Sequence, residues 1–82
     1  MVIIYSTSWC GPCKFAKQFL DSKNIEYEEI DIEVRNINRQ ELSEITGGST
    51  VPQIIINEKC IGGFDNLLKL EESGELNKLL KK

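Results

Sequence analysis

The feature that most constrains this fold is a short β-branched run that leads, through a few polar residues, into a closely spaced pair of cysteines. Val2-Ile3-Ile4-Tyr5 is apolar and β-branched, which is typical of a buried strand, and the polar residues Ser6-Thr7-Ser8 end it. Apolar residues then recur at helical spacing from Cys13 to about Ser22, which predicts an amphipathic helix. Cys10 and Cys13 therefore lie where a strand passes into a helix.

The apolar face of this first helix consists of Phe15, Ala16, Phe19 and Leu20. Residues 25–31 mix apolar and acidic side chains, as a partly buried strand does. A second helix is predicted from about Val34 to Ile45, where Gly47-Gly48 provides the stop. The apolar face of that helix is formed by Val34, Ile37, Leu42 and Ile45.

The last third of the chain predicts a hairpin and two helices. Gln53-Ile54-Ile55-Ile56 and Cys60-Ile61 are two short strands joined by a tight turn at Asn57-Glu58-Lys59. Asp65 is a good N-cap for a following helix, and a last short helix begins after Ser73-Gly74. The resulting order, β-α-β-α-β-β-α, predicts an α/β fold with one mixed sheet covered by helices.

The composition narrows the class of protein. With 82 residues and 40% hydrophobic content, the chain has room for one core, so residues 1–82 are expected to form a single domain. The net charge of -3, with both signs mixed along the chain, lacks the basic cluster of a nucleic-acid-binding face. No segment resembles a signal peptide or a membrane span, and we expect a cytoplasmic protein that contacts neither nucleic acid nor membrane.

The cysteines indicate chemistry rather than a disulfide framework. Cys10, Cys13 and Cys60 are an odd set without an export signal, and the chain contains no histidine that could act as a base or as a metal ligand. A thiol attacks a disulfide only as its thiolate, and the start of a helix favours a thiolate through its free N–H groups and its dipole. We therefore expect Cys10 to attack and Cys13, one turn further along and more shielded, to resolve.

The residues around the pair suit this role. Pro12 has no N–H to lose at a helix start, and Gly11 lets a substrate backbone approach closely. Trp9 either offers a flat apolar surface to a partner or simply packs beside the site. For Cys60, on a hairpin strand, the alternatives are a buried small hydrophobe and a redox-regulatory thiol.

Metal binding is the non-enzymatic alternative. A structural zinc site normally takes four ligands, and three cysteines without histidine do not supply them, so no metal site within one chain is expected. An iron–sulfur cluster shared between two chains would escape this count and stays the alternative to catalysis.

The sequence motifs resemble those of two protein families. The run Trp9-Cys10-Gly11-Pro12-Cys13-Lys14 is similar to the thioredoxin active site, whereas the rest of the chain resembles glutaredoxins over nearly its whole length. The glutaredoxin pattern is carried by Thr50-Val51-Pro52-Gln53, Ile56-Asn57 and Ile61-Gly62-Gly63-Phe64-Asp65. The resemblance implies a thioredoxin-like fold with a four-stranded mixed sheet and a thiol–disulfide oxidoreductase activity.

The resemblance also assigns roles to residues beyond the cysteines. Pro52 would be a cis-proline that faces the pair, Val51 would offer its backbone to a substrate strand or to glutathione, and Thr50 would flank the groove. The glutamyl end of glutathione would be received by Gly63, Phe64 and Asp65. For Asp65, a simple helix cap is the other explanation, and both roles can coexist.

Departures from both families indicate the partners. Glutaredoxins typically have a lysine at the position of Thr7 and an aromatic residue at the position of Pro12. Thioredoxins have an aspartate at the position of Ile4 and a proline at the position of Gln18. Such a hybrid resembles small redoxins that take electrons from thioredoxin reductase, some of which supply ribonucleotide reductase. We therefore expect a monomeric reductase of protein disulfides without a tightly bound cofactor, with glutathione as the alternative reductant and co-substrate.

Overall fold

The computed structural model describes residues 1–80, which form a four-stranded sheet between two helical layers. The strand order is β2-β1-β3-β4, with β1 parallel to β2 and the other neighbours antiparallel. The strands are β1 (Val2–Ser6), β2 (Glu28–Asp31), β3 (Gln53–Ile56) and β4 (Lys59–Gly62). The helices are α1 (Gly11–Ser22), α2 (Arg39–Thr46), α3 (Phe64–Ser73) and α4 (Glu75–Leu80). The predicted α/β fold with a mixed sheet is confirmed.

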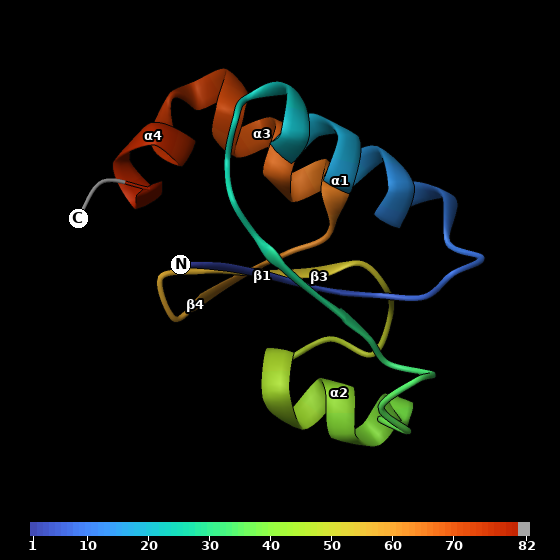
Figure 1. Cartoon of the computed structure of the whole chain (residues 1–82). Coiled ribbons are helices and arrows are strands. Elements are labelled where there is room, and N and C mark those ends of the chain that lie inside the picture. The colour runs from blue at the N-terminus through green and yellow to red at the C-terminus, as the bar shows by residue number, and fades with distance from the viewer. Residues whose placement is uncertain (81–82) are drawn as a thin grey trace.

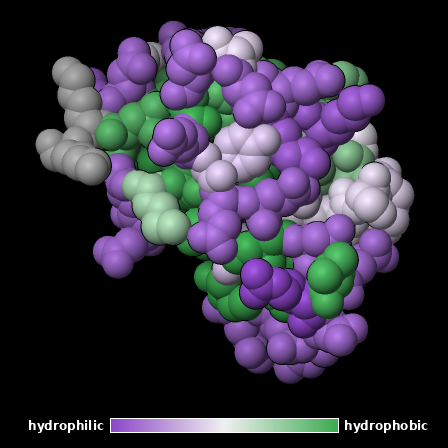
Figure 2. Space-filling model, in the orientation of Figure 1, coloured by the Kyte–Doolittle hydropathy of each residue, from purple (hydrophilic) through white to green (hydrophobic). Residues whose placement is uncertain are grey.

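The two faces of the sheet are covered unequally (Figure 1). Helices α1, α3 and α4 lie over one face, and α2 alone lies over the other. Because side chains alternate along β1, Val2 and Ile4 pack into the larger core with α1 and α3, whereas Tyr5 packs with α2. The outer surfaces of the helices are mostly hydrophilic, and apolar side chains gather where helices meet the sheet (Figure 2).

The first helix begins earlier than the apolar spacing predicts. Its first residue is Gly11 rather than Cys13, and Cys10 is its N-cap, because the Cys10 side chain accepts a hydrogen bond from the Cys13 N–H. At the other end, Asn24 has a φ of 58° and the Ile25 N–H still bonds to Leu20 O at 2.9 Å. The chain is therefore still turning at Ile25, so that the second strand starts at Glu28 and not at residue 25.

The second helix is shorter than predicted and starts at Arg39 instead of Val34. Two side chains determine this difference. The Asp31 carboxylate accepts the N–H groups of Glu33 and Val34 at 2.9 and 3.2 Å, which holds residues 32–36 in turns. Asn38 then caps the helix, because its side-chain oxygen accepts the Glu41 N–H at 2.8 Å in a capping box.

The hairpin and the third helix also differ in detail from the prediction. Asn57 and Glu58 have φ values of 49° and 72°, so the turn is a two-residue loop and Lys59 already belongs to β4. Gly63, not Asp65, is the N-cap of α3, with an extended backbone and no side-chain cap bond. Asp65 lies in the first turn of the helix, where its charge still suits the helix dipole.

None of the helices within residues 1–80 has the length and apolar character needed to cross a membrane.

Candidate active site

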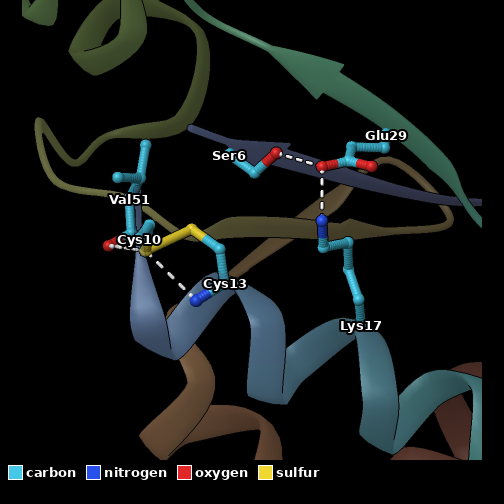
Figure 3. Close-up of a disulfide and its surroundings, with 6 residues drawn as sticks. All are labelled: Ser6, Cys10, Cys13, Lys17, Glu29 and Val51. Carbon is cyan, nitrogen blue, oxygen red and sulfur yellow. Dashed lines mark hydrogen bonds and ion pairs between the residues drawn. A yellow bond between two sulfur atoms is a disulfide. The ribbon is translucent and has the colours of Figure 1, made fainter. Parts of the chain in front are cut away.

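The cysteine pair lies at the N-terminal end of α1, where the helix emerges from the end of β1 (Figure 3). Cys10 and Cys13 are joined by a disulfide with a Cα–Cα distance of 5.2 Å. The Cys10 sulfur accepts the Cys13 N–H at 3.1 Å, and Gly11 and Pro12 form the first helical residues between them. Exposed fractions are 8% for Cys10 and 0% for Cys13, so the first cysteine is the one that a partner can reach.

The segment before β3 meets the pair from the opposite side. The Val51–Pro52 peptide bond is cis, as the family resemblance predicts. The Val51 carbonyl oxygen lies 3.6 Å from the Cys10 sulfur, so a reduced Cys10 thiol can donate to it (Figure 3). The backbone of Val51 therefore borders the reactive sulfur directly.

A hollow of about 390 Å³ flanks the pair on the α3 side. It is lined by most of the residues that the sequence singles out, namely Pro12, Thr50, Val51, Pro52, Gly63, Phe64 and Asp65, together with Phe15 and Asn66. Phe15 belongs to the predicted apolar face of the first helix, but its side chain is exposed and its ring stacks on that of Phe64 at 6.2 Å between centroids. Helical periodicity assigns Phe15 to the apolar face of the helix but does not show which part of that face the sheet leaves uncovered. The sequence analysis therefore did not predict that Phe15 lines this hollow.

A second hollow, of about 290 Å³, lies on the α2 side and includes Thr7, Trp9, Arg39 and Val51 in its lining. The Trp9 ring is 63% exposed, and its indole N–H donates to the Glu33 carboxylate at 3.1 Å. Thr7 is buried, and its hydroxyl has no hydrogen-bond partner among residues 1–80. Arg39 donates to the Ser49 carbonyl oxygen at 2.8 Å. Its guanidinium supplies a positive charge to the hollow that Thr7 also lines, and Thr7 stands where glutaredoxins typically have a lysine.

The sequence prediction missed Arg39, although its signal was present. Asn38 followed three residues later by Glu41 is a capping box, which would have started α2 at Arg39 and placed this cation near the end of the sheet.

Behind the disulfide, three polar side chains from three elements form a hydrogen-bonded chain (Figure 3). The Ser6 hydroxyl donates to Glu29 Oε2 at 2.6 Å, and Lys17 Nζ donates to the same oxygen at 2.8 Å. The Lys17 ammonium and then the Ser6 hydroxyl lower the pKa of Glu29, while Glu29 raises the pKa of Lys17. None of the three was singled out from the sequence, because only the strand register brings them together.

Cys60 is half-buried on β4 and carries a free thiol, with its sulfur 3.7 Å from Gln53 Oε1. It lies outside both hollows beside the cysteine pair. Within residues 1–80, no three side chains of the metal-ligating types come together as a group that could hold one ion.

A dithiol pair capping the helix after the first strand, opposite a cis-proline, defines the thiol–disulfide oxidoreductases of the thioredoxin fold. The family model for glutaredoxins matches residues 2–61. The chain therefore belongs to the glutaredoxin family, as its motifs predicted, and is a thiol–disulfide oxidoreductase.

Similar proteins support this assignment. A glutaredoxin of Pseudomonas aeruginosa is 44% identical over 79 residues, which covers 96% of this chain and 94% of that protein. Glutaredoxin 3 of Escherichia coli is 40% identical over 80 residues, covering 98% and 96% of the two chains.

Among solved structures, a buckwheat glutaredoxin–glutathione complex superposes with a TM-score of 0.86 at 29% identity, covering 96% of this chain and 74% of that one. A glutaredoxin from Brucella melitensis gives a TM-score of 0.82 at 42% identity, with coverages of 98% and 87%.

Proposed function

We propose that this glutaredoxin reduces disulfide bonds of other proteins by a dithiol mechanism, with Cys10 as the attacking thiolate and Cys13 as the resolving thiol. The observation that supports these roles is the position of Cys10 as the N-cap of α1, where its sulfur accepts the Cys13 N–H at 3.1 Å. A negative sulfur is stabilised there by the same bond and by the helix dipole, so the helix start favours the Cys10 thiolate without any histidine.

The reaction then balances over two exchanges. The Cys10 thiolate attacks one sulfur of the partner's disulfide, forming a mixed disulfide, and the other partner sulfur leaves as a thiolate and takes a proton from water. Cys13 next attacks the Cys10 sulfur, forming the Cys10–Cys13 bond and releasing the second partner thiolate. The partner gains two electrons and the chain loses two.

The lining of the α3-side hollow serves substrate binding in this proposal. Val51 borders the Cys10 sulfur at 3.6 Å, so an extended substrate segment would bond to its backbone. Thr50, Pro52 and Pro12 line the hollow, and Gly11 lies between Pro12 and Cys10 at the start of α1. Trp9 supplies an exposed aromatic surface on the opposite rim.

For the reductant, we propose thioredoxin reductase, because the Gly11-Pro12 loop is of the thioredoxin type and Thr7 supplies no cation. Glutathione is the second candidate, and Arg39 is the observation that favours it. Arg39 lies beside the α2-side cavity while Gly63, Phe64 and Asp65 lie on the other side of the pair, so both ends of a glutathione molecule would find polar partners. The similar buckwheat structure is a glutathione complex.

Trapping tests the dithiol mechanism. In Cys13→Ser, a protein disulfide substrate should accumulate as a mixed disulfide on Cys10 and turnover should stop, whereas Cys60→Ser, the matched control, should turn over like the wild type. Mass spectrometry after an acid quench detects the adduct. Wild-type rates of protein-disulfide turnover in Cys13→Ser would refute the mechanism.

Side-by-side recycling distinguishes the reductants. The oxidised protein is mixed with NADPH and thioredoxin reductase, or with glutathione, NADPH and glutathione reductase, and NADPH oxidation is followed. We expect faster recycling in the first mixture; recycling by glutathione alone would overturn that assignment.

The cellular setting is part of the same proposal. An odd cysteine count with a free Cys60 suits a reducing compartment, so we place the activity in the cytoplasm of the cell, with the chain acting as a monomer. Ribonucleotide reductase is the partner that the resemblance suggests.

A further inference from the structure

Phe15 leaves an aromatic ring exposed near the reactive pair, although it belongs to the apolar face of α1. The exposed fraction of this residue is 56%. Phe19, one helical turn further along the same face, packs against the larger core, whereas Phe15 is a member of neither core within residues 1–80. An exposed ring contributes little to the stability of a fold, so packing of the core does not account for an aromatic side chain at this position.

The contact that Phe15 makes is with Phe64, the first residue of α3. The two ring centroids lie 6.2 Å apart with an interplanar angle of 29°, which is a stacked arrangement. This stack joins α1 to α3 and forms an aromatic wall of the α3-side hollow. Because α1 also carries Cys10 at its start, the wall is held at a fixed place relative to the reactive sulfur.

The remaining lining of this hollow favours an uncharged ligand. Pro12 and Pro52 add two more apolar side chains, and among the lining residues within 1–80 only Asp65 is charged. An acidic group in the hollow would therefore meet a like charge and no cation. A large apolar side chain would cover the aromatic wall and leave Asp65 in contact with water, because Asp65 is exposed.

The hollow is continuous with the place of reaction. Val51 lines it, and the Val51 carbonyl oxygen lies 3.6 Å from the Cys10 sulfur. In an extended substrate segment, side chains two residues apart point to the same side, and their Cα atoms are about 6.6 Å apart. A target cysteine that faces Cys10 therefore turns the side chain two positions away toward the same surface, and at one end of the segment this surface is the hollow.

We propose that Phe15 is a specificity-determining residue, which together with Phe64 binds a large apolar side chain of the substrate protein two positions from the target cysteine. The inference rests on the proposed reduction of protein disulfides by Cys10. The apolar side chain leaves water while the mixed disulfide forms, so its binding accelerates the first exchange and selects among disulfides. Exposed aromatic side chains beside a site of reaction commonly serve as such contacts.

Peptide mixed disulfides test this binding. Each peptide carries one cysteine bonded to 2-nitro-5-thiobenzoate, with glycine, phenylalanine, glutamate or lysine two positions before or after it. Attack of Cys10 on the peptide sulfur breaks the mixed disulfide and releases the coloured thiolate. A stopped-flow instrument therefore gives the second-order rate constant of the first exchange. Every protein carries Cys60→Ser, which removes the third thiol.

The exposed area of Phe15 sets the expected effect. A phenylalanine side chain presents about 200 Å², so the exposed part of Phe15 is roughly 110 Å². The burial of half of this area corresponds to about tenfold in a rate constant. With the wild type, the phenylalanine peptide should therefore react about tenfold faster than the glycine peptide at one of the two positions, and the glutamate peptide should react more slowly than both.

Matched variants assign the preference to the ring. Phe15→Ala should lower the phenylalanine-to-glycine ratio about tenfold at that position. The rate of the glycine peptide should stay unchanged, because Cys10 is untouched. Phe15→Leu, which keeps an apolar side chain, should keep most of the ratio. Ile45→Ala is the control, since Ile45 is 49% exposed but lines neither hollow beside the pair. Its ratio should equal that of the wild type.

Three results would overturn the inference. The first is equal rates for the phenylalanine and glycine peptides with the wild type, and the second is an unchanged ratio in Phe15→Ala. The third is a lysine peptide faster than the phenylalanine peptide, which would make the hollow a site for cations at Asp65. The proposed function fails separately. If mass spectrometry shows that wild-type protein retains the peptide as an adduct and Cys13 does not release its thiol, the dithiol mechanism is wrong whatever the ratio.

Discussion

Removal of the Trp9 ring should discriminate between protein and small-molecule substrates. The indole stands beside Cys10 and is 63% exposed, although its N–H is held by Glu33 at 3.1 Å. A surface aromatic fixed in this way offers a flat area that a protein partner can cover and that a small disulfide barely touches. Trp9→Ala should therefore lower kcat/KM for a protein disulfide and leave that for a small disulfide nearly unchanged.

The size of the effect follows from the exposed area. A large aromatic side chain presents about 250 Å², so the exposed part of Trp9 is roughly 160 Å². A partner that covers half of this area gains about 2 kcal/mol at ~25 cal/mol per Å². The expected loss in kcat/KM is therefore roughly 30-fold.

Insulin and hydroxyethyl disulfide serve as the two substrates, and both are measured with the same reductant. Val34→Ala removes an exposed apolar side chain outside both hollows and is the control for surface change. A thermal melt of each variant shows whether the fold is intact. Equal losses for insulin and for the small disulfide would refute the contact role of Trp9, because they would indicate a changed Cys10 and not a lost docking surface.

Two further predictions concern stability. Asn38→Ala removes the side-chain cap of α2, which accepts the Glu41 N–H at 2.8 Å. The free energy of unfolding should fall by about 1 kcal/mol in urea, and the Tm should fall by roughly 4–8 °C in a thermal melt. A change no larger than that of the surface variant Glu44→Ala would contradict this prediction. Lys17→Met should cost about 0.5 kcal/mol at pH 7, as an exposed ion pair does. Because the folded-state pKa of Glu29 is lowered, the pair stabilises above the unfolded value of about 4.3, and this contribution is lost as the pH falls through the lowered value. The gap between Lys17→Met and wild type should therefore close in acid, and a gap that is equal at pH 7 and in acid would show that Glu29 is not the partner.

The order of elements could be predicted from the sequence because each strand and helix carries its own local pattern. The run from Val2 to Tyr5 is β-branched, and Asn57-Glu58 separates two apolar strands in the way that a hairpin requires. The cis peptide bond before Pro52 followed from the family resemblance. These features depend on residues that are close together in the chain or on motifs of fixed spacing.

The predictions that failed concern the residues at which the helices begin. Val34 fits the period of the second helix, but Asp31 takes the N–H groups that would begin it. Asp65 is a good cap by residue type, yet Gly63 occupies the cap because the chain leaves β4 there. For α2, the side chains that satisfy the free backbone N–H groups determine where the helix begins, whereas α3 begins where the backbone leaves the strand, without a side-chain cap.

The two cysteines are chemically unequal because of where α1 begins. Had the helix begun at Cys13, as its apolar spacing predicts, Cys10 would not have been its N-cap. With Gly11 as the first helical residue, Cys10 becomes the N-cap and receives the Cys13 N–H, whereas Cys13 lies in the first turn of the helix with its side chain fully buried. One cysteine thus caps the helix and keeps 8% of its surface exposed, whereas the other is fully enclosed. A single helical turn therefore creates the two environments on which the proposed roles of attacking and resolving thiol rest, in a chain that has no histidine to distinguish the two cysteines.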